Sequence, residues 1–260
     1  MGIERITAAF AARKKEGRKA LIVYLCAGDP SLEVTGQAVR ELAGAGVDLI
    51  ELGVPFSDPV ADGPVIQAAS KRALAAGVTL PEILELVKSL RSGLAVPLIL
   101  MSYYNPLLQY GLERLTADLA AAGVDGLIVP DLPLEENPPL RQTLEPAGLA
   151  LIPLVAPTTP GERLARIAAT ARGFIYCVSL TGVTGVREGL PPGIDEYLAG
   201  VRAVTDLPLG IGFGIGSPDQ ARLLAPMGDG IIVGSALVDV LHQEGLPAAL
   251  RLVERLRHAL

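Results

Sequence analysis

The most constraining feature of this sequence is a short apolar run that recurs eight times, each time followed by a stretch with helical spacing. Most of the runs are apolar nearly throughout, as expected for parallel strands that are buried on both faces. The runs cover residues 20–28, 47–55, 96–103, 124–131, 149–157, 173–180, 207–214 and 228–235. Eight strand–helix units in about 250 residues are typical of a closed (β/α)8 barrel.

No linker or change of composition divides the chain, so we expect one domain over residues 1–260. The entries into the strands also repeat, with Ala-Gly-Val-Asp at 45–48 and 122–125 and Met-Gly-Asp-Gly at 227–230. The main alternative is a doubly wound sheet, which usually carries a glycine-rich dinucleotide motif after its first strand. Cys-Ala-Gly-Asp-Pro at 26–30 is not such a motif. We therefore predict a single-domain α/β TIM barrel with extra helices.

Composition and charge exclude several classes of protein. Half of the residues are apolar and 19% are charged, which rules out a disordered or fibrous chain. The net charge of −6 argues against nucleic acid or an anionic membrane as the main partner. No apolar stretch approaches the ~18–20 residues of a membrane span, and the first residues lack a signal-peptide core. Cys26 and Cys177 lie inside apolar runs, which is typical of buried thiols in a reducing compartment. We expect a soluble, cytoplasmic protein.

Active sites of such barrels lie at the carboxyl ends of the strands, so the polar residues there are informative. All five lysines precede the third run and none ends a strand, which argues against a Schiff-base mechanism. Both histidines, His242 and His258, follow the eighth run, and no cluster of His, Cys or carboxylates predicts a metal site. Carboxylates are the ionisable groups that remain at the strand ends.

Two of these carboxylates are candidate catalytic residues. Glu51 lies near the exit of the second run, and Asp62 lies in the Pro- and Gly-rich loop that follows. Burial among Leu and Ile would raise the pKa of Glu51 into a range where the group can both donate and accept a proton. Asp62, in a wetter loop, would stay ionised more easily. The alternatives are an ion pair with an Arg for Glu51 and an ordinary turn for Asp62. Asp131, at the fourth exit, is expected to cap or shape the following loop.

Glycine-rich segments end the last three runs, at 179–185, 210–216 and 234–235. Glycine lets backbone N–H groups approach an anion, and many barrels hold a phosphate at this place. These segments favour a phosphate site, with tight packing turns as the alternative. Gly-Val-Thr-Gly at 182–185 also has the glycine hinges of a lid. The residues together predict proton transfer on a phosphate-bearing, sugar-phosphate-like substrate.

At these same residues the sequence resembles the tryptophan synthase α subunit family, over essentially the whole chain. The most specific match is Leu-Ile-Glu-Leu-Gly-Val-Pro-Phe-Ser-Asp-Pro-Val-Ala-Asp-Gly-Pro at 49–64. Further matches are Ala-Gly-Asp-Pro at 27–30, Ser-Tyr-Tyr-Asn-Pro at 102–106, Val-Pro-Asp-Leu-Pro at 129–133 and the glycine-rich segments. The resemblance implies retro-aldol cleavage of indole-3-glycerol phosphate to indole and glyceraldehyde 3-phosphate.

The resemblance also implies residue roles. Glu51 would protonate C3 of the indole ring and assist removal of the glycerol hydroxyl proton, and Asp62 would stabilise the charge growing on the indole nitrogen. Tyr176 resembles the family's tyrosine near the catalytic Glu. The other implied substrate-binding positions are Gly185, Gly214, Gly234 and Ser235 for the phosphate, Tyr24 and Phe213 for the indole ring, and Thr184 in the lid.

A partner is implied in the same way. The family works with a β subunit that carries pyridoxal phosphate and receives indole through a tunnel, in an α2β2 assembly, so no cofactor is expected in this chain. Segments 55–64 and 105–110 resemble the docking surfaces. Two alternatives stay open: a free-standing indole-3-glycerol phosphate lyase, and a non-catalytic regulatory subunit that binds a phosphate ligand. The presence of both Glu51 and Asp62 argues against the second.

Overall fold

The structure is a computed structural model, and it describes residues 2–178, 192–212 and 214–260. The strands are β1 (Ala20–Cys26), β2 (Leu49–Gly53), β3 (Leu98–Met101), β4 (Gly126–Ile128), β5 (Ala150–Ile152), β6 (Leu154–Val155), β7 (Ile175–Val178), β8 (Leu209–Gly212) and β9 (Gly230–Val233). The α-helices are α1 (Gly2–Lys15), α2 (Leu32–Gly44), α3 (Pro64–Ala75), α4 (Leu80–Arg91), α5 (Tyr104–Tyr110), α6 (Leu112–Ala122), α7 (Pro138–Leu144), α8 (Gly161–Thr170), α9 (Ile194–Arg202), α10 (Pro218–Leu224), α11 (Ser235–Glu244) and α12 (Leu246–Ala259). Short 3-10 helices cover Glu145–Ala147 and Ala225–Met227.

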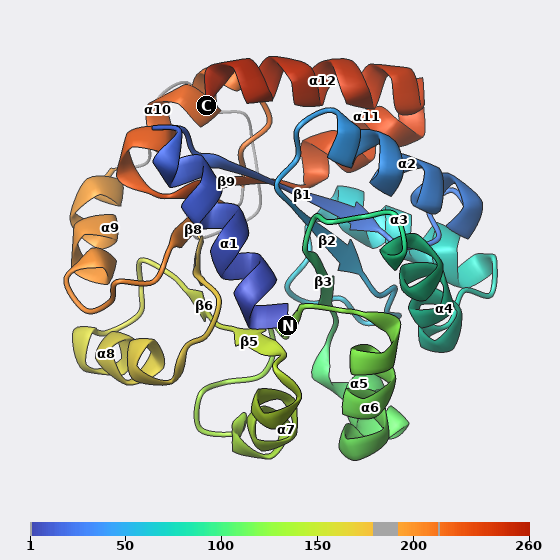
Figure 1. The fold of residues 1–260 in the computed structure, drawn as a ribbon, viewed down its shortest axis with the longest axis horizontal. Helices are drawn as coiled ribbons and strands as arrows, with labels where there is room; N and C mark the ends of the chain where they lie inside the picture. Colours follow the sequence, from blue (N-terminus) through green and yellow to red (C-terminus); the bar gives the residue numbers. More distant parts are fainter. Residues whose placement is uncertain (1, 179–191, 213) are drawn as a thin grey trace.

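The strands form a ring that is closed by a single segment of the chain. Neighbouring strands are parallel, in the order β5-β4-β3-β2-β1-β9-β8-β7-β6. The two ends of this order, β5 and β6, follow each other in the sequence and are separated only by Pro153. Helices surround the ring, as Figure 1 shows. The predicted (β/α)8 barrel with extra helices is therefore confirmed.

The fifth predicted strand is the one that differs from the expected pattern, because Pro153 divides it into β5 and β6. Proline has no N–H to donate to a strand ladder. Its carbonyl oxygen still accepts a hydrogen bond from the Tyr176 N–H, at 3.0 Å. Residues 150–152 pair with β4, whereas Leu154 and Val155 pair with β7. The two halves of the divided strand therefore pair with different neighbours, β5 with β4 and β6 with β7, and the ring closes between them.

The barrel interior is filled by apolar side chains, and α1 covers its amino-terminal end. Ile6 and Phe10 of α1 belong to the same buried cluster as inward-facing residues of the strands. The rings of Phe10 and Phe174 lie with their centroids 5.4 Å apart. In Figure 1, α1 crosses the centre of the ring of strands. Because this end is filled, the open end of the barrel is the carboxyl end of the strands.

The repeated strand entries carry an aspartate that has a structural role. The side chains of Asp48, Asp125 and Asp229 each accept a hydrogen bond, at 2.8 Å, from the backbone N–H of a residue on the neighbouring strand. Each carboxylate also pairs with arginine. The donors are Leu21, Leu98 and Leu209, and the arginines are Arg13 and Arg257, Arg5 and Arg91, and Arg202. The repeat therefore joins adjacent strands at the end of the barrel opposite the open end.

The structure bears on two expectations from composition, which concern membrane-spanning segments and the two cysteines. In the described ranges, no helix has both the length and the apolar character that a membrane crossing requires. Cys26 and Cys177 are buried and free, as their apolar surroundings in the sequence indicated.

Candidate active site

A cavity of about 350 Å³ opens at the carboxyl ends of the strands. Seven of the ten residues predicted for the site line it, namely Tyr24, Glu51, Asp62, Tyr176, Gly214, Gly234 and Ser235. The other three, Thr184, Gly185 and Phe213, lie outside the described residues. Apolar side chains of Ile66, Met101 and Ile232 complete much of the wall. The strand topology thus brings together residues that are far apart in the sequence.

Glu51 is a fully buried carboxyl group at the edge of this cavity. It lies on β2, beside Tyr24 of β1 and Ile99 of β3 in the register of the sheet. Both carboxyl oxygens are buried, and neither has a hydrogen-bond partner among the described residues. Burial alone raises the pKa of Glu51 to about 8. No described Arg or Lys pairs with Glu51, so the ion-pair alternative finds no support.

The raised pKa of Glu51 predicts an effect on stability. The native state holds this proton up to about pH 8, whereas the unfolded chain releases it near pH 4.5. The free energy of unfolding should therefore fall as the pH rises from 4.5 to 8, by roughly 5 kcal/mol for this group. Glu51→Gln removes the titration, so the variant should be more stable than the parent at about pH 9 and similar at about pH 4, in urea unfolding. Equal pH dependence in both proteins would contradict this, and the exposed Glu136→Gln is the control.

Asp62 lies half-buried in the loop between β2 and α3. Its Oδ2 accepts a hydrogen bond from the Tyr103 hydroxyl, at 3.1 Å, and its backbone N–H donates to the Pro59 carbonyl. Desolvation raises the pKa of Asp62, and the Tyr103 hydroxyl opposes this shift. The expectation of a wetter site holds in part, because Asp62 is less buried than Glu51. The turn is made by the backbone, so the carboxylate itself remains available to the cavity.

Tyr103 is a site residue that the sequence reasoning did not single out. It follows β3, and its hydroxyl accepts a hydrogen bond from the Ala61 N–H at 2.9 Å while donating to Asp62. Its ring stacks on Phe56, with centroids 5.2 Å apart. These contacts fix the loop that carries Asp62 over the cavity. The available signal was a tyrosine just after the strand next to β2, where both strand ends meet.

Two glycines at strand ends make room for the tyrosines of the cavity. A methyl group at Gly53 would lie 1.9 Å from the Tyr24 hydroxyl oxygen, and one at Gly212 would lie 2.6 Å from the Tyr176 hydroxyl oxygen. Burial raises the pKa of both tyrosines well above the ordinary value, so both stay protonated. Part of the glycine content at the strand ends therefore serves close packing, which was the alternative to a phosphate site.

Gly53→Ala should lower the free energy of unfolding by about 1–3 kcal/mol, because the added methyl group forces the buried Tyr24 ring to move. Urea unfolding measures this effect. Gly200→Ala, in the exposed interior of α9 with open space around it, is the control and should be neutral or stabilising by up to ~1 kcal/mol. In a Tyr24→Ala background, Gly53→Ala should cost much less. An equal cost in both backgrounds would contradict the explanation.

The other glycines fit an anion site. Gly234 precedes α11, and Gly234, Ser235 and Ala236 all line the cavity. The first backbone N–H groups of a helix have no partner within the helix, and the helix dipole favours negative charge there. Gly214 lines the same side with a φ of +80°, a left-handed conformation that favours glycine. Within the described ranges, no three His, Cys, Asp or Glu side chains gather as a metal ion would require.

The fold and the cavity together are those of a (β/α)8-barrel enzyme, with a buried carboxyl group, a second carboxyl group and the N-terminus of α11 around one cavity at the carboxyl ends of the strands. The family model described as tryptophan synthase alpha chain matches residues 10–257. The chain is 51% identical over 239 residues to the tryptophan synthase alpha chain of Carboxydothermus hydrogenoformans, covering 92% of this chain and 90% of the relative. It is 50% identical over 256 residues to that of Synechococcus elongatus, covering 98% and 96%.

Solved structures agree with the sequence relatives. The fold matches a Mycobacterium tuberculosis tryptophan synthase structure with a TM-score of 0.91 at 40% identity, over 98% of this chain and 97% of that one. It matches tryptophan synthase subunit alpha from Legionella pneumophila with a TM-score of 0.90 at 36% identity, over 98% and 97%. The chain therefore belongs to the tryptophan synthase alpha chain family. It is a lyase that cleaves indole-3-glycerol phosphate to indole and glyceraldehyde 3-phosphate.

Proposed function

We propose that Glu51 is the acid and base of this cleavage. Its protonated carboxyl group donates a proton to C3 of the indole ring, which turns the ring into an electron acceptor. A proton then leaves the hydroxyl group next to C3, the bond between C3 and the glycerol carbon breaks, and the electron pair returns to the ring. Glu51 accepts the hydroxyl proton, so it ends the cycle as it began. The observation that carries this proposal is a buried carboxyl group with no partner among the described residues and a pKa of about 8.

Asp62 stabilises the positive charge that develops on the indole nitrogen when C3 is protonated. Asp62 lines the same cavity, and the Tyr103 hydroxyl donates a hydrogen bond to one oxygen of its carboxylate. A preorganised carboxylate costs little reorganisation when the charge appears. Desolvation raises the pKa of both carboxyl groups, but only at Asp62 does a hydrogen bond, from Tyr103, oppose the shift, which favours the protonated form at Glu51 and the ionised form at Asp62.

The remaining cavity residues bind the substrate. Gly214, Gly234 and Ser235 hold the phosphate at the N-terminus of α11, and Tyr24 and Tyr176 line the space for the indole ring. Gly185 completes the phosphate site, Phe213 the indole site and Thr184 the lid, on the strength of the sequence resemblance alone. In this proposal, binding of the phosphate by the glycines positions C3 of the indole ring next to the carboxyl group of Glu51.

The product indole passes to a β partner that makes L-tryptophan, in an α2β2 assembly in the cytoplasm. The support is the name of the relatives, which are the alpha chains of tryptophan synthase. Segments 55–64 and 105–110 form the docking surface in this proposal. They carry Val60, which is 85% exposed, and Leu108, which is 51% exposed. Pyridoxal phosphate belongs to the partner, because no lysine of this chain ends a strand.

An assay of indole release from indole-3-glycerol phosphate, with and without a β partner, tests the proposal. Release that the β partner accelerates, together with a stable complex in size-exclusion chromatography, is expected. Release at the same rate with no complex would point to a free-standing lyase. Phosphate-ligand binding without any release would point to a regulatory subunit.

A further inference from the structure

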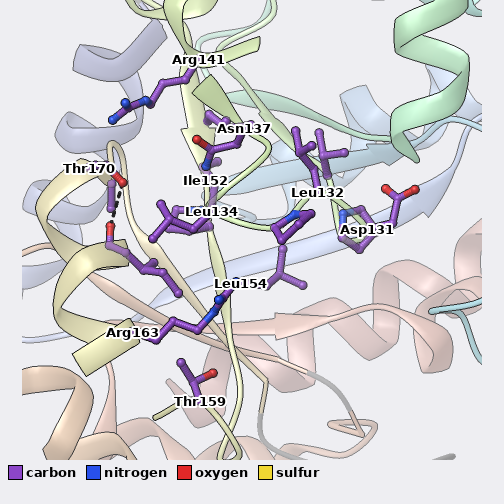
Figure 2. A pocket seen from close by; sticks show the side chains of 17 residues that line it. Asp131, Leu132, Leu134, Asn137, Arg141, Ile152, Leu154, Thr159, Arg163 and Thr170 are labelled. Carbon is purple, nitrogen blue, oxygen red and sulfur yellow. Dashed lines mark hydrogen bonds between the residues drawn. The ribbon is translucent and has the colours of Figure 1, made fainter. Parts of the chain in front are cut away.

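A second cavity, of about 380 Å³, lies between α7 and α8, beside β5 and β6. It covers the point where Pro153 divides the fifth strand, and none of its lining residues lines the active-site cavity. Figure 2 shows it from close by, with Asn137 and Arg141 at one end, Arg163 and Thr159 at the other, and Leu134 and Leu154 between them. A cavity of this size is in the range of small-molecule sites.

The middle of this cavity is apolar. Its wall includes Leu132, Leu134, Leu151 and Ile167. Leu151 belongs to the outward-facing side of β5 but stays half-buried, whereas the outward-facing residues of β1, β2 and β4 are fully covered. The helix that follows β4, α7, has only seven residues, so it leaves part of the strand uncovered. The hollow has the character of a binding site for an apolar side chain.

One end of the cavity carries two buried polar atoms whose hydrogen-bonding capacity is unused in the described part of the chain. They are Oδ1 of Asn137, an acceptor, and Nε of Arg141, a donor. No described carboxylate forms an ion pair with Arg141, whereas Arg163 at the far end is held by both oxygens of Glu135, at 2.9 and 2.8 Å. A buried polar atom left without a partner costs about 1–3 kcal/mol, so this end is suited to an occupant with both a donor and a negative charge.

The geometry points to a second ligand site that binds an α-amino acid with a large apolar side chain. Its carboxylate would pair with the Arg141 guanidinium, its ammonium group would donate to Oδ1 of Asn137, and its side chain would contact Leu134, Leu151 and Ile167. A simple anion satisfies Arg141 but leaves the amide oxygen of Asn137 facing negative charge. A water molecule satisfies the polar atoms but leaves the apolar hollow unfilled. This inference does not depend on the chemistry proposed for Glu51.

Binding of L-phenylalanine to the full chain tests the inference, by calorimetry with glycerol 3-phosphate present in excess to fill the active-site cavity. We expect saturable binding at one site. Two matched probes each lack one charged group: 3-phenylpropionate has no ammonium group, and 2-phenylethylamine has no carboxylate. Each probe should bind at least ~10-fold more weakly than L-phenylalanine, because each loses one charge-assisted contact. Equal binding of 3-phenylpropionate would overturn the assignment to an amino acid.

Variants place the site on the chain. Arg141→Met and Asn137→Ala should each weaken L-phenylalanine binding at least ~10-fold, while Arg222→Met on the exposed surface of α10 should leave it unchanged. Because Arg141 has no ion pair to lose in the described structure, its variant should keep the parent's melting temperature and its rate of indole release. The inference is overturned if L-phenylalanine does not bind, if Arg141→Met binds it normally, or if glycerol 3-phosphate displaces it.

Discussion

Glu51→Gln should lower the rate of indole formation about 10²–10⁴-fold, the usual contribution of a general acid–base group. The amide has the same shape as the carboxyl group, but it cannot donate a proton to carbon or accept one from a hydroxyl group. The cavity and its glycine-rich side stay unchanged, so binding of glycerol 3-phosphate should persist. Steady-state indole release and calorimetric titration of the ligand measure the two quantities. A variant with near-normal turnover would remove Glu51 from the mechanism.

The pH dependence of the parent enzyme checks the same role without a substitution. Burial raises the pKa of Glu51 to about 8, so the group is protonated at neutral pH and loses its proton above that value. Protonation of C3 requires the acid form, and the rate of indole formation should therefore fall as the pH rises through about 8. A rate that stays level from pH 7 to about pH 10 would require a different acid.

Asp62→Asn should lower kcat/KM for indole formation about 10²–10³-fold, as expected when a preorganised charge opposite the transition state is removed. The asparagine oxygen can still accept the hydrogen bond from Tyr103, so the loop should keep its place and the melting temperature should change little. Asp58→Asn, an exposed change in the same loop, is the matched control in the isolated chain. A melting temperature that falls together with activity would instead make Asp62 a structural residue.

The barrel and the position of Glu51 were predictable because both depend on local patterns. Continuous apolar runs indicate strands that are buried on both faces, and an ionisable residue within such a run stands out. Asp131 differs from the expectation that it caps or shapes the loop that follows it, because its Oδ1 accepts a hydrogen bond from the Tyr104 N–H at 2.9 Å. The group that it caps belongs to the preceding strand–helix unit, which the sequence does not reveal.

Features that depend on contacts between distant segments were not predictable. Tyr103 meets Asp62 across 41 residues, and the Asp48 carboxylate meets Arg257 across 209. No local periodicity encodes such pairs. The division of the fifth strand at Pro153 is an intermediate case, because a proline inside an apolar run indicates a break, but the two different neighbours of the halves follow only from closure of the ring.

The two cavities approach each other along the paired strands β6 and β7. Leu154 lines the cavity between α7 and α8, and Tyr176 lines the active-site cavity. These two residues are direct neighbours in the sheet. Only one further pair, Val155 and Cys177, connects the same two strands. Leu154 also packs against the cluster that fills the barrel interior, to which Tyr176 belongs, so an occupant of the cavity between α7 and α8 would contact a residue of the same packed layer as the tyrosine of the active-site cavity.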